Sequence, residues 1–296
     1  MAPPLTPGGL VALLEQLPWG EEGVPRSLAE LLIPSRQRPR RIGGLPPGRL
    51  EFLLLAALAI SGWSARIALV EALTAIQRLH PRSGSYQQAF RHLEEKGLWM
   101  TCVVQLCYRK MALVRLSPRG ADLLRQAGVP VVLSEWERIE LAHRRKRQAG
   151  EMSKHTAAVC IFLYHARRRG YTTEACPTVD KNVPHWAQPD AAVERCGLRI
   201  YVEVQCRGGR PYRIAQKWRN QEQLQGFAAI CTMAPVWAAR LARQAQSCGV
   251  SRGVVTDLST LINQDPPALW THCWLSPYDP LQPVVRDEAE ADWLVA

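Results

Sequence analysis

Asp190 and Glu203 are the two acidic residues whose positions best suit a divalent metal site. Asp190 opens one predicted strand, and Glu203 lies near the end of the next, in the segment Ile-Tyr-Val-Glu-Val-Gln that ends at Gln205. Residues 203 and 205 project from the same face of a strand, and a neighbouring strand can place Asp190 beside them. The two carboxylates could then hold Mg²⁺ while Gln205 orients a water molecule for attack on a phosphodiester.

Each of these residues also has a simpler structural interpretation. Asp190 follows Pro189, which is a common arrangement for a turn residue at the start of a strand. Glu203 lies in a run typical of a central strand, where an unpaired carboxylate is expensive to bury. We therefore expect it to have a partner, either a metal ion or an arginine such as Arg207. Gln205 is also compatible with an ordinary polar residue at the end of a strand.

Two basic side chains are further candidates near this pair. Lys217 lies in the basic segment Arg-Ile-Ala-Gln-Lys-Trp-Arg, which is predicted to be helical. A solvated helix face is its simplest interpretation, and contact with a phosphate is the functional one. His155 is expected to be a packed or capping histidine rather than a base.

The second half of the chain predicts the elements that would position these residues. Helical and β-type segments alternate there, which predicts an α/β domain with helices over both faces of a mixed sheet. The predicted helices cover 151–169, 212–225 and 236–248, and the predicted strands lie near 173 and at 190–193, 199–205, 227–233 and 253–256.

The first half of the chain predicts three helices, a β-hairpin and a further helix. Ser64 is expected to cap the second helix and Ser117 the last one, which has Pro118 in its first turn. This order is similar to that of winged helix-turn-helix domains, which are α+β structures. The three helices are expected at 50–60, 65–73 and 85–96, and the two strands at 98–107 and 111–116.

The third predicted helix and the tip of the hairpin, the wing, carry the candidate DNA contacts. Tyr86, Phe90 and Leu93 recur at helical spacing and are expected to pack inward. The opposite face offers glutamine and arginine, which suit base edges, and the wing tip offers cations for phosphates. A winged helix that contacts protein instead is the alternative. The candidate nucleic-acid-binding residues are Ser85, Gln87, Gln88, Arg91, Arg109 and Lys110.

The amino-acid composition indicates the kind of partner and the cellular compartment of the protein. The net charge of +11 favours an anionic partner, although excess positive charge also serves solubility. Nine cysteines without a Cys-x-x-Cys pair indicate reduced thiols rather than disulfides or a zinc site. The longest apolar run, at 52–60, is too short to cross a bilayer, and the first residues do not have the pattern of a signal peptide. We therefore expect a cytoplasmic protein that does not enter a membrane.

Asp190, Glu203 and Gln205 together resemble the site of the PD-(D/E)XK nuclease superfamily. The resemblance implies a restriction-endonuclease-like fold, Mg²⁺ as cofactor, and an Asp and a Glu that bind it while a lysine usually completes the set. Gln205 stands where that lysine is usual. Some active members carry Gln at this place, and others supply the lysine from the following helix, where this chain has Lys217.

Several short motifs extend this resemblance along the chain. They are Lys-His-Thr-Ala-Ala-Val at 154–159, Gln-Pro-Asp-Ala-Ala-Val at 188–193, Tyr-Val-Glu-Val-Gln at 201–205 and the segment 228–240. In this order, and after a winged helix, they resemble the replication-relaxation family of bacterial plasmids and mobile elements, over about residues 50–265. That resemblance implies a role in plasmid replication and DNA relaxation.

The expected organisation has five segments. They are a Pro- and Arg-rich arm at 1–48, the winged helix at 49–130, a basic helical linker at 131–150, the nuclease-like domain at 151–275 and an acidic tail at 276–296. The leading interpretation is a protein that docks on double-stranded DNA in a plasmid or mobile-element system and cleaves phosphodiesters with Mg²⁺. The alternative is a non-catalytic factor whose nuclease-like domain binds a replication, transposition or defence protein.

Overall fold

The computed structural model describes residues 5–17, 48–77, 79–143, 154–179, 188–206 and 211–284. The chain divides into two compact units. One, here called the helical unit, consists of Leu5–Val103 and Met111–Arg138, and the other, here called the sheet unit, consists chiefly of Ile139–Ala296 together with Val104–Lys110. Within the described ranges, no helix is long and apolar enough to cross a membrane.

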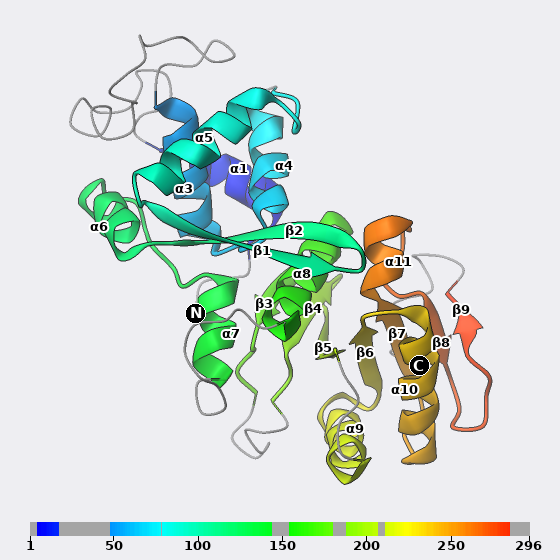
Figure 1. The fold of residues 1–296 in the computed structure, drawn as a ribbon. Coiled ribbons are helices and arrows are strands. Elements are labelled where there is room, and N and C mark those ends of the chain that lie inside the picture. The colour runs from blue at the N-terminus through cyan, green and yellow to red at the C-terminus, as the bar shows by residue number, and fades with distance from the viewer. Residues whose placement is uncertain are drawn as a thin grey trace. The chain divides into compact units, whose positions relative to one another are not determined.

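The helical unit is built around one central helix, α3 (Arg49–Ser61). This helix is buried on every side over its first eleven residues, as expected for a helix that is apolar around its whole circumference. Its neighbours in the fold are α1 (Pro7–Glu15), α4 (Arg66–Gln77), α5 (Gly84–Glu95) and α6 (Pro118–Gln126). The strands β1 (Trp99–Leu106) and β2 (Arg109–Leu116) form a separate two-stranded sheet (Figure 1). The predicted order of three helices, a hairpin and a helix is therefore the observed order.

One of the two predicted helix caps is present and the other is not. The hydroxyl of Ser117 accepts the Gly120 N–H at 3.0 Å and caps α6 as predicted. Ser64 does not cap α4; its hydroxyl accepts the N–H of Trp136 at 2.9 Å, and its own N–H donates to Glu135 at 3.1 Å. Ser64 therefore joins the start of α4 to α7 (Glu135–His143), a contact across the chain that local sequence does not encode.

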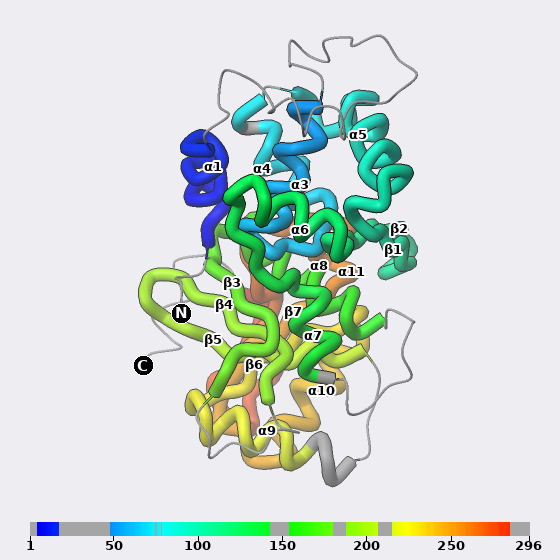
Figure 2. The backbone as a smooth tube through the Cα atoms, turned by 90° about the vertical axis from the view of Figure 1, so that its left-hand side faces the viewer, coloured from blue at the N-terminus to red at the C-terminus, as the bar shows by residue number. Residues whose placement is uncertain are grey.

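The first helix, α1, lies within the segment 1–48 that was predicted to be an arm, and it belongs to the helical unit. Helix α1 is capped by Thr6, which accepts the Gly9 N–H at 3.1 Å. Leu10 and Leu14, four residues apart on one face, are buried, and α1 packs against α3 and α4 (Figure 2). The Pro- and Arg-rich stretch of the predicted arm lies outside the described residues.

The predicted linker at 131–150 contains α7 and its cap. Glu137 and Ser134 form a capping box, in which the Glu137 N–H donates to the Ser134 hydroxyl at 3.3 Å and the Ser134 N–H donates to the Glu137 carboxylate at 2.9 Å. The basic run that follows α7 lies outside the described residues.

The sheet unit contains a mixed sheet, as predicted, and it has seven strands, two more than the five predicted. Strands β3, β4 and β5 pair antiparallel, β5, β6 and β7 pair in parallel, and β7, β8 and β9 return to antiparallel pairing. The strands are β3 (Thr172–Ala175), β4 (Ala191–Arg195), β5 (Leu198–Gln205), β6 (Ala228–Thr232), β7 (Gly253–Asp257), β8 (His272–Trp274) and β9 (Gln282–Pro283). Strand β9 lies inside the segment predicted to be an acidic tail, so the fold continues beyond the predicted domain boundary.

Helices cover both faces of this sheet. Every residue of β6 and β7 is buried, which requires a layer on each side. Helix α8 (Lys154–Arg168) packs on β3, β4 and β5, whereas α9 (Pro211–Gln225) and α10 (Pro235–Ser247) pack on β5, β6 and β7 (Figure 1). Trp218 of α9 and Trp274 of β8 join Ile230, Val255 and α10 in one apolar cluster.

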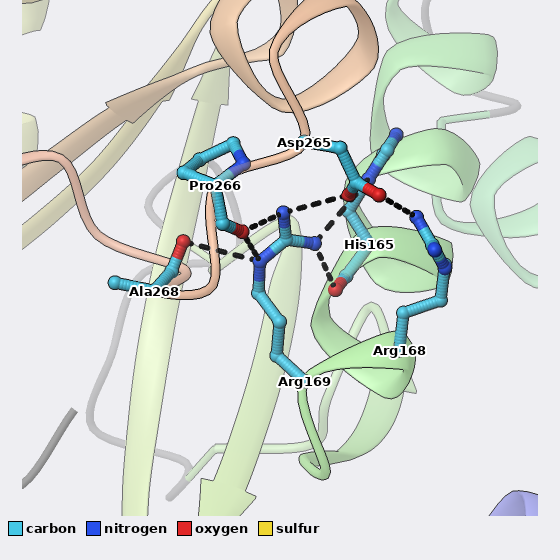
Figure 3. Close-up of polar contacts among 6 residues, drawn as sticks. All are labelled: His165, Arg168, Arg169, Asp265, Pro266 and Ala268. Carbon is cyan, nitrogen blue, oxygen red and sulfur yellow. Dashed lines mark hydrogen bonds and ion pairs between the residues drawn. The ribbon is translucent and has the colours of Figure 1, made fainter.

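An arginine cluster fastens the end of α8 to the loop after α11 (Leu258–Asn263). Arg169 donates to the carbonyl oxygens of Pro266 and Ala268 at 3.0 and 3.1 Å, and to Asp265 at 3.1 Å (Figure 3). Arg168 binds the other oxygen of Asp265 at 2.6 Å. These contacts tie the end of α8 to the loop after α11.

Candidate active site

The carboxyl ends of three parallel strands meet at one edge of the sheet. The last residues of β5, β6 and β7 are Gln205, Thr232 and Asp257, and they lie in register. Open α/β sheets bind their ligands at this kind of edge. Asp257 caps α11 by accepting the Thr260 N–H at 2.8 Å. Glu203, which is fully buried in β5, is therefore the acid at this edge that remains for chemistry.

Asp190 is fixed immediately before β4 by bonds from both its backbone and its side chain. Its N–H donates to the Val202 carbonyl at 3.1 Å, and its carbonyl accepts the Cys176 N–H at 2.9 Å. One carboxylate oxygen accepts the Val204 N–H at 2.9 Å, and the other lies 3.1 Å from Nε2 of His155, in the first turn of α8. Asp190 is thus anchored beside Glu203 and is not a solvated turn residue.

Helix α9 brings one face against β5, and Lys217 lies on that face. Lys217, Gln221 and Gln225 follow at intervals of four residues, which places them in one row along the helix. Gln225 accepts the Tyr201 N–H at 2.8 Å and donates to the Tyr201 carbonyl at 2.9 Å. Gln221 accepts the Ala229 N–H of β6 at 3.0 Å. These amide bonds to both strands fix the helix and direct the lysine toward the sheet.

The ammonium group of Lys217 forms an ion pair with Oε2 of Glu203. The lysine side chain is only 22 % exposed and the glutamate side chain 0 %, so water does little to screen the pair. In the described part of the chain, no group donates a hydrogen bond to Oε1 of Glu203. The buried carboxyl group therefore has Lys217 as its cationic partner and Asp190 as its acidic neighbour.

The ionisable groups at this edge shift one another's pKa. Burial alone would raise the pKa of Asp190, but the charges of His155 and Lys217 hold it below its usual range. Burial raises the pKa of Glu203 to about 8, with the charge of Asp190 adding to the shift and Lys217 opposing it. Burial alone would lower the pKa of Lys217, but the charges of Glu203 and Asp190 raise it. Asp190 is therefore ionised at neutral pH, whereas Glu203 exchanges its proton in the mildly alkaline range.

The donor set fits a magnesium ion. Mg²⁺ takes oxygen ligands and is bound in proteins through one or two carboxylates while it keeps several waters. Asp190 and Glu203 supply the two carboxylates, and Oε1 of Glu203 accepts no hydrogen bond from the described residues. Across the described ranges, no group of three or more His, Cys, Asp or Glu side chains could hold a metal ion, so coordination here would rest on this pair and on water.

The structure brings together three of the four predicted catalytic residues: Asp190, Glu203 and Lys217. The observed partner of Glu203 is Lys217, which was not the partner expected from the sequence. The arginine that was expected, Arg207, lies outside the described residues. Lys217 is turned toward the sheet, so its interpretation as part of a solvated face is wrong. Gln205 is half-buried and lies two residues beyond Glu203 on β5, where strand alternation gives it the same face.

Sequence reasoning missed the role of His155. His155 is packed, as predicted, with its side chain 20 % exposed, but the sequence did not indicate that its Nε2 lies 3.1 Å from a carboxylate oxygen of Asp190. His155 and Asp190 lie close together because the first turn of α8 meets the end of β5. At this contact the thiol of Cys206 lies 3.9 Å from the carbonyl oxygen of Lys154. In the sequence, the only local indication of a role for His155 was its place in the motif at 154–159.

In the helical unit, α5 has the two faces that were predicted. Tyr86, Phe90 and Leu93 are buried. Two acidic residues, Glu94 and Glu95, are also exposed on this helix and limit its positive charge. Of the predicted DNA contacts, Gln87 and Arg91 are exposed and Ser85 and Gln88 are half-buried, while Arg109 and Lys110 are exposed at the start of β2.

Comparison with protein-family models, with curated proteins and with solved structures finds no match for this chain. The resemblances to the PD-(D/E)XK superfamily and to the replication-relaxation family are therefore carried by the motifs quoted above and by the residues of the site.

Proposed function

We propose that this chain is a DNA-binding protein of a plasmid or mobile-element system, whose sheet unit cleaves phosphodiester bonds with Mg²⁺. The observation that carries the proposal is the convergence of Asp190, Glu203 and Lys217 at the carboxyl edge of the parallel strands. A lysine from the helix after the second acidic strand is one of the arrangements that the PD-(D/E)XK resemblance allows. Lys217 of α9 corresponds to it.

Each residue has a role that follows from its chemistry. Asp190 and Glu203 would hold the metal, which supplies a Lewis acid and an activated water molecule when bound. Asp190 is already ionised and anchored by the Val204 N–H, so it needs no rearrangement to act as a ligand. Lys217 would place its positive charge against the scissile phosphate, and Gln205 would orient the attacking water through its amide.

The first half of the chain supplies the proposed DNA contact as a winged helix-turn-helix, with α5 in the helical unit and the tip of the hairpin, Val104–Lys110, in the sheet unit. In this proposal α5 enters the major groove, where Gln88 and Arg91 read base edges. Arg109 and Lys110 at the start of β2 bind phosphates. The net charge of +11 supports an anionic partner and a marked dependence of affinity on salt.

The cleavage proposal is tested with the purified full chain and supercoiled plasmid, with and without Mg²⁺ or Mn²⁺. We expect metal-dependent nicking, and a loss of at least about a hundredfold in rate for Asp190→Asn and for Glu203→Gln, as for the removal of one essential group from a preorganised site. Asp122→Asn, on the exposed surface of α6, is the matched control and should retain full activity. Nicking that persists in the Asp190→Asn, Glu203→Gln double variant would place the activity elsewhere.

A second candidate is a non-catalytic assembly factor, and one observation favours it. Each carboxylate of the site already has an internal basic partner, His155 for Asp190 and Lys217 for Glu203. A platform that binds a replication, transposition or defence protein needs no free charge at this edge. Undiminished DNA affinity in divalent-free buffer, with no cleavage after Mg²⁺ or Mn²⁺ is added, would favour this candidate.

A further inference from the structure

Basic side chains of the chain itself already lie against both carboxylates of the site. Nζ of Lys217 occupies one oxygen of Glu203, and Nε2 of His155 lies against one oxygen of Asp190 while the Val204 N–H occupies the other. A metal ion held between the two carboxylates needs oxygen atoms that these groups now hold. Oε1 of Glu203 accepts no hydrogen bond from the described residues, so it is the oxygen at which a metal ion could first approach the pair.

We propose that Lys217 is a resident counter-ion of the metal site, which keeps the site closed and is displaced when the metal binds. This inference rests on the proposed function, because it concerns the same carboxylates. It adds that Lys217 has two positions, one on Glu203 and one turned away from it toward the substrate.

The electrostatic reason is the burial of the pair. Whenever the carboxyl group of Glu203 is ionised, its charge needs a compensating partner because the side chain is 0 % exposed, and Lys217 is the cation that faces it. A divalent ion is a stronger partner for two adjacent carboxylates, but it must first replace the ammonium group. Lys217 therefore weakens metal binding in the metal-free protein, and binding of the metal releases Lys217 from Glu203.

Helix α9 has the construction that this exchange requires. Gln221 and Gln225 hold the helix to β5 and β6 through backbone groups that are independent of the carboxylates. The lysine has a long flexible side chain and partial exposure, so its ammonium group can leave Glu203 while the helix stays in place.

The test compares Mn²⁺ affinity by isothermal titration in the full-length wild type and in three variants. Lys217→Met removes the ammonium group but keeps the length of the side chain, and we expect it to bind Mn²⁺ about tenfold more tightly or better. Lys217→Arg retains the charge and should bind no more tightly than wild type. Lys96→Met, in the helical unit, is the matched control and should leave the affinity unchanged.

Two outcomes separate this inference from the proposed function. If wild type and Lys217→Met bind Mn²⁺ equally well, the metal site stands and the counter-ion role is refuted. If neither protein binds Mn²⁺, the metal site itself is refuted and the inference falls with it.

A measurement on the wild type covers the case in which Lys217→Met does not fold. Acetylation of lysines by acetic anhydride, mapped by mass spectrometry, reports how accessible each ammonium group is. We expect saturating Mn²⁺ to increase the labelling of Lys217 severalfold and to leave Lys96 unchanged. Labelling of Lys217 that falls or stays constant as Mn²⁺ saturates the site would contradict displacement.

Discussion

Substitution of Lys217 by Met should destabilise the protein by about 3–5 kcal/mol at pH 9, because it leaves the buried carboxylate of Glu203 without a counter-ion. Two unit charges about 4 Å apart attract by about 4 kcal/mol at an effective dielectric constant near 20, which agrees with that range. The burial of both side chains limits the screening of this attraction by water. Urea unfolding of the full chain measures the loss.

The loss should depend on pH in a defined direction. Burial raises the pKa of Glu203 to about 8 in the folded protein, above its usual value. The folded state therefore binds this proton more tightly than the unfolded state, and the resulting contribution to stability is largest at low pH. It is lost as the pH rises through 8. Without Lys217 that pKa rises further, so the variant binds more protons than wild type above pH 8. The difference in stability should grow by at most about 1.4 kcal/mol per pH unit there, and should be smallest near pH 6.

A double-mutant cycle isolates the pair from other effects of the substitution. When Glu203→Gln is combined with Lys217→Met, residue 217 no longer faces a buried charge. The double variant should therefore lose about 1–3 kcal/mol less stability than the sum of the two single losses. Losses that add to within about 0.5 kcal/mol, or a loss for Lys217→Met that is the same at pH 6 and pH 9, would refute the electrostatic account.

Three further predictions concern other parts of the molecule. Gln88→Ala with Arg91→Ala should lower the affinity for a preferred duplex by about 1–3 kcal/mol per lost base contact in fluorescence anisotropy, and unchanged affinity and sequence preference would remove α5 as the reading helix. Arg109→Ala with Lys110→Ala should reduce the slope of log affinity against log salt by about 2, and an unchanged slope would exclude wing contacts with phosphates. Burial lowers the pKa of His165 to about 4, so stability should fall by about 3 kcal/mol as the pH drops from 6.5 through 4. In urea unfolding, His165→Gln should make this dependence of stability on pH less steep. An equally steep dependence would assign the loss of stability in acid to other groups.

Periodic and local features of the fold were predictable from the sequence. Tyr86, Phe90 and Leu93 recur at helical spacing and are buried in α5, and Ser117 before Pro118 is a cap with a local partner. These signals depend on residues within one or two turns of one another, so they need no knowledge of the rest of the chain.

Contacts between distant segments were not predictable in the same way. Ser64 binds α7 instead of capping its own helix, and His155 reaches Asp190 only because the first turn of α8 ends at the sheet edge. Strands β8 and β9 have three and two residues, too few for an alternating pattern. The pairing of Glu203 with Lys217 was predictable in part. The sequence indicated that a buried Glu203 needs a partner, but only the packing of α9 on β5 shows that this partner is Lys217.

The crossover from β5 through α9 to β6 has a consequence for the order of folding. It contains both Glu203 and Lys217 within one contiguous stretch, so their ion pair forms once this strand, helix and strand have docked. His155 comes from an earlier helix and arrives through a contact of longer sequence separation, which is slower to form. Pulsed hydrogen exchange should therefore show protection of β5 and α9 before the first turn of α8, so that the charge of the glutamate is neutralised locally before the rest of the site assembles.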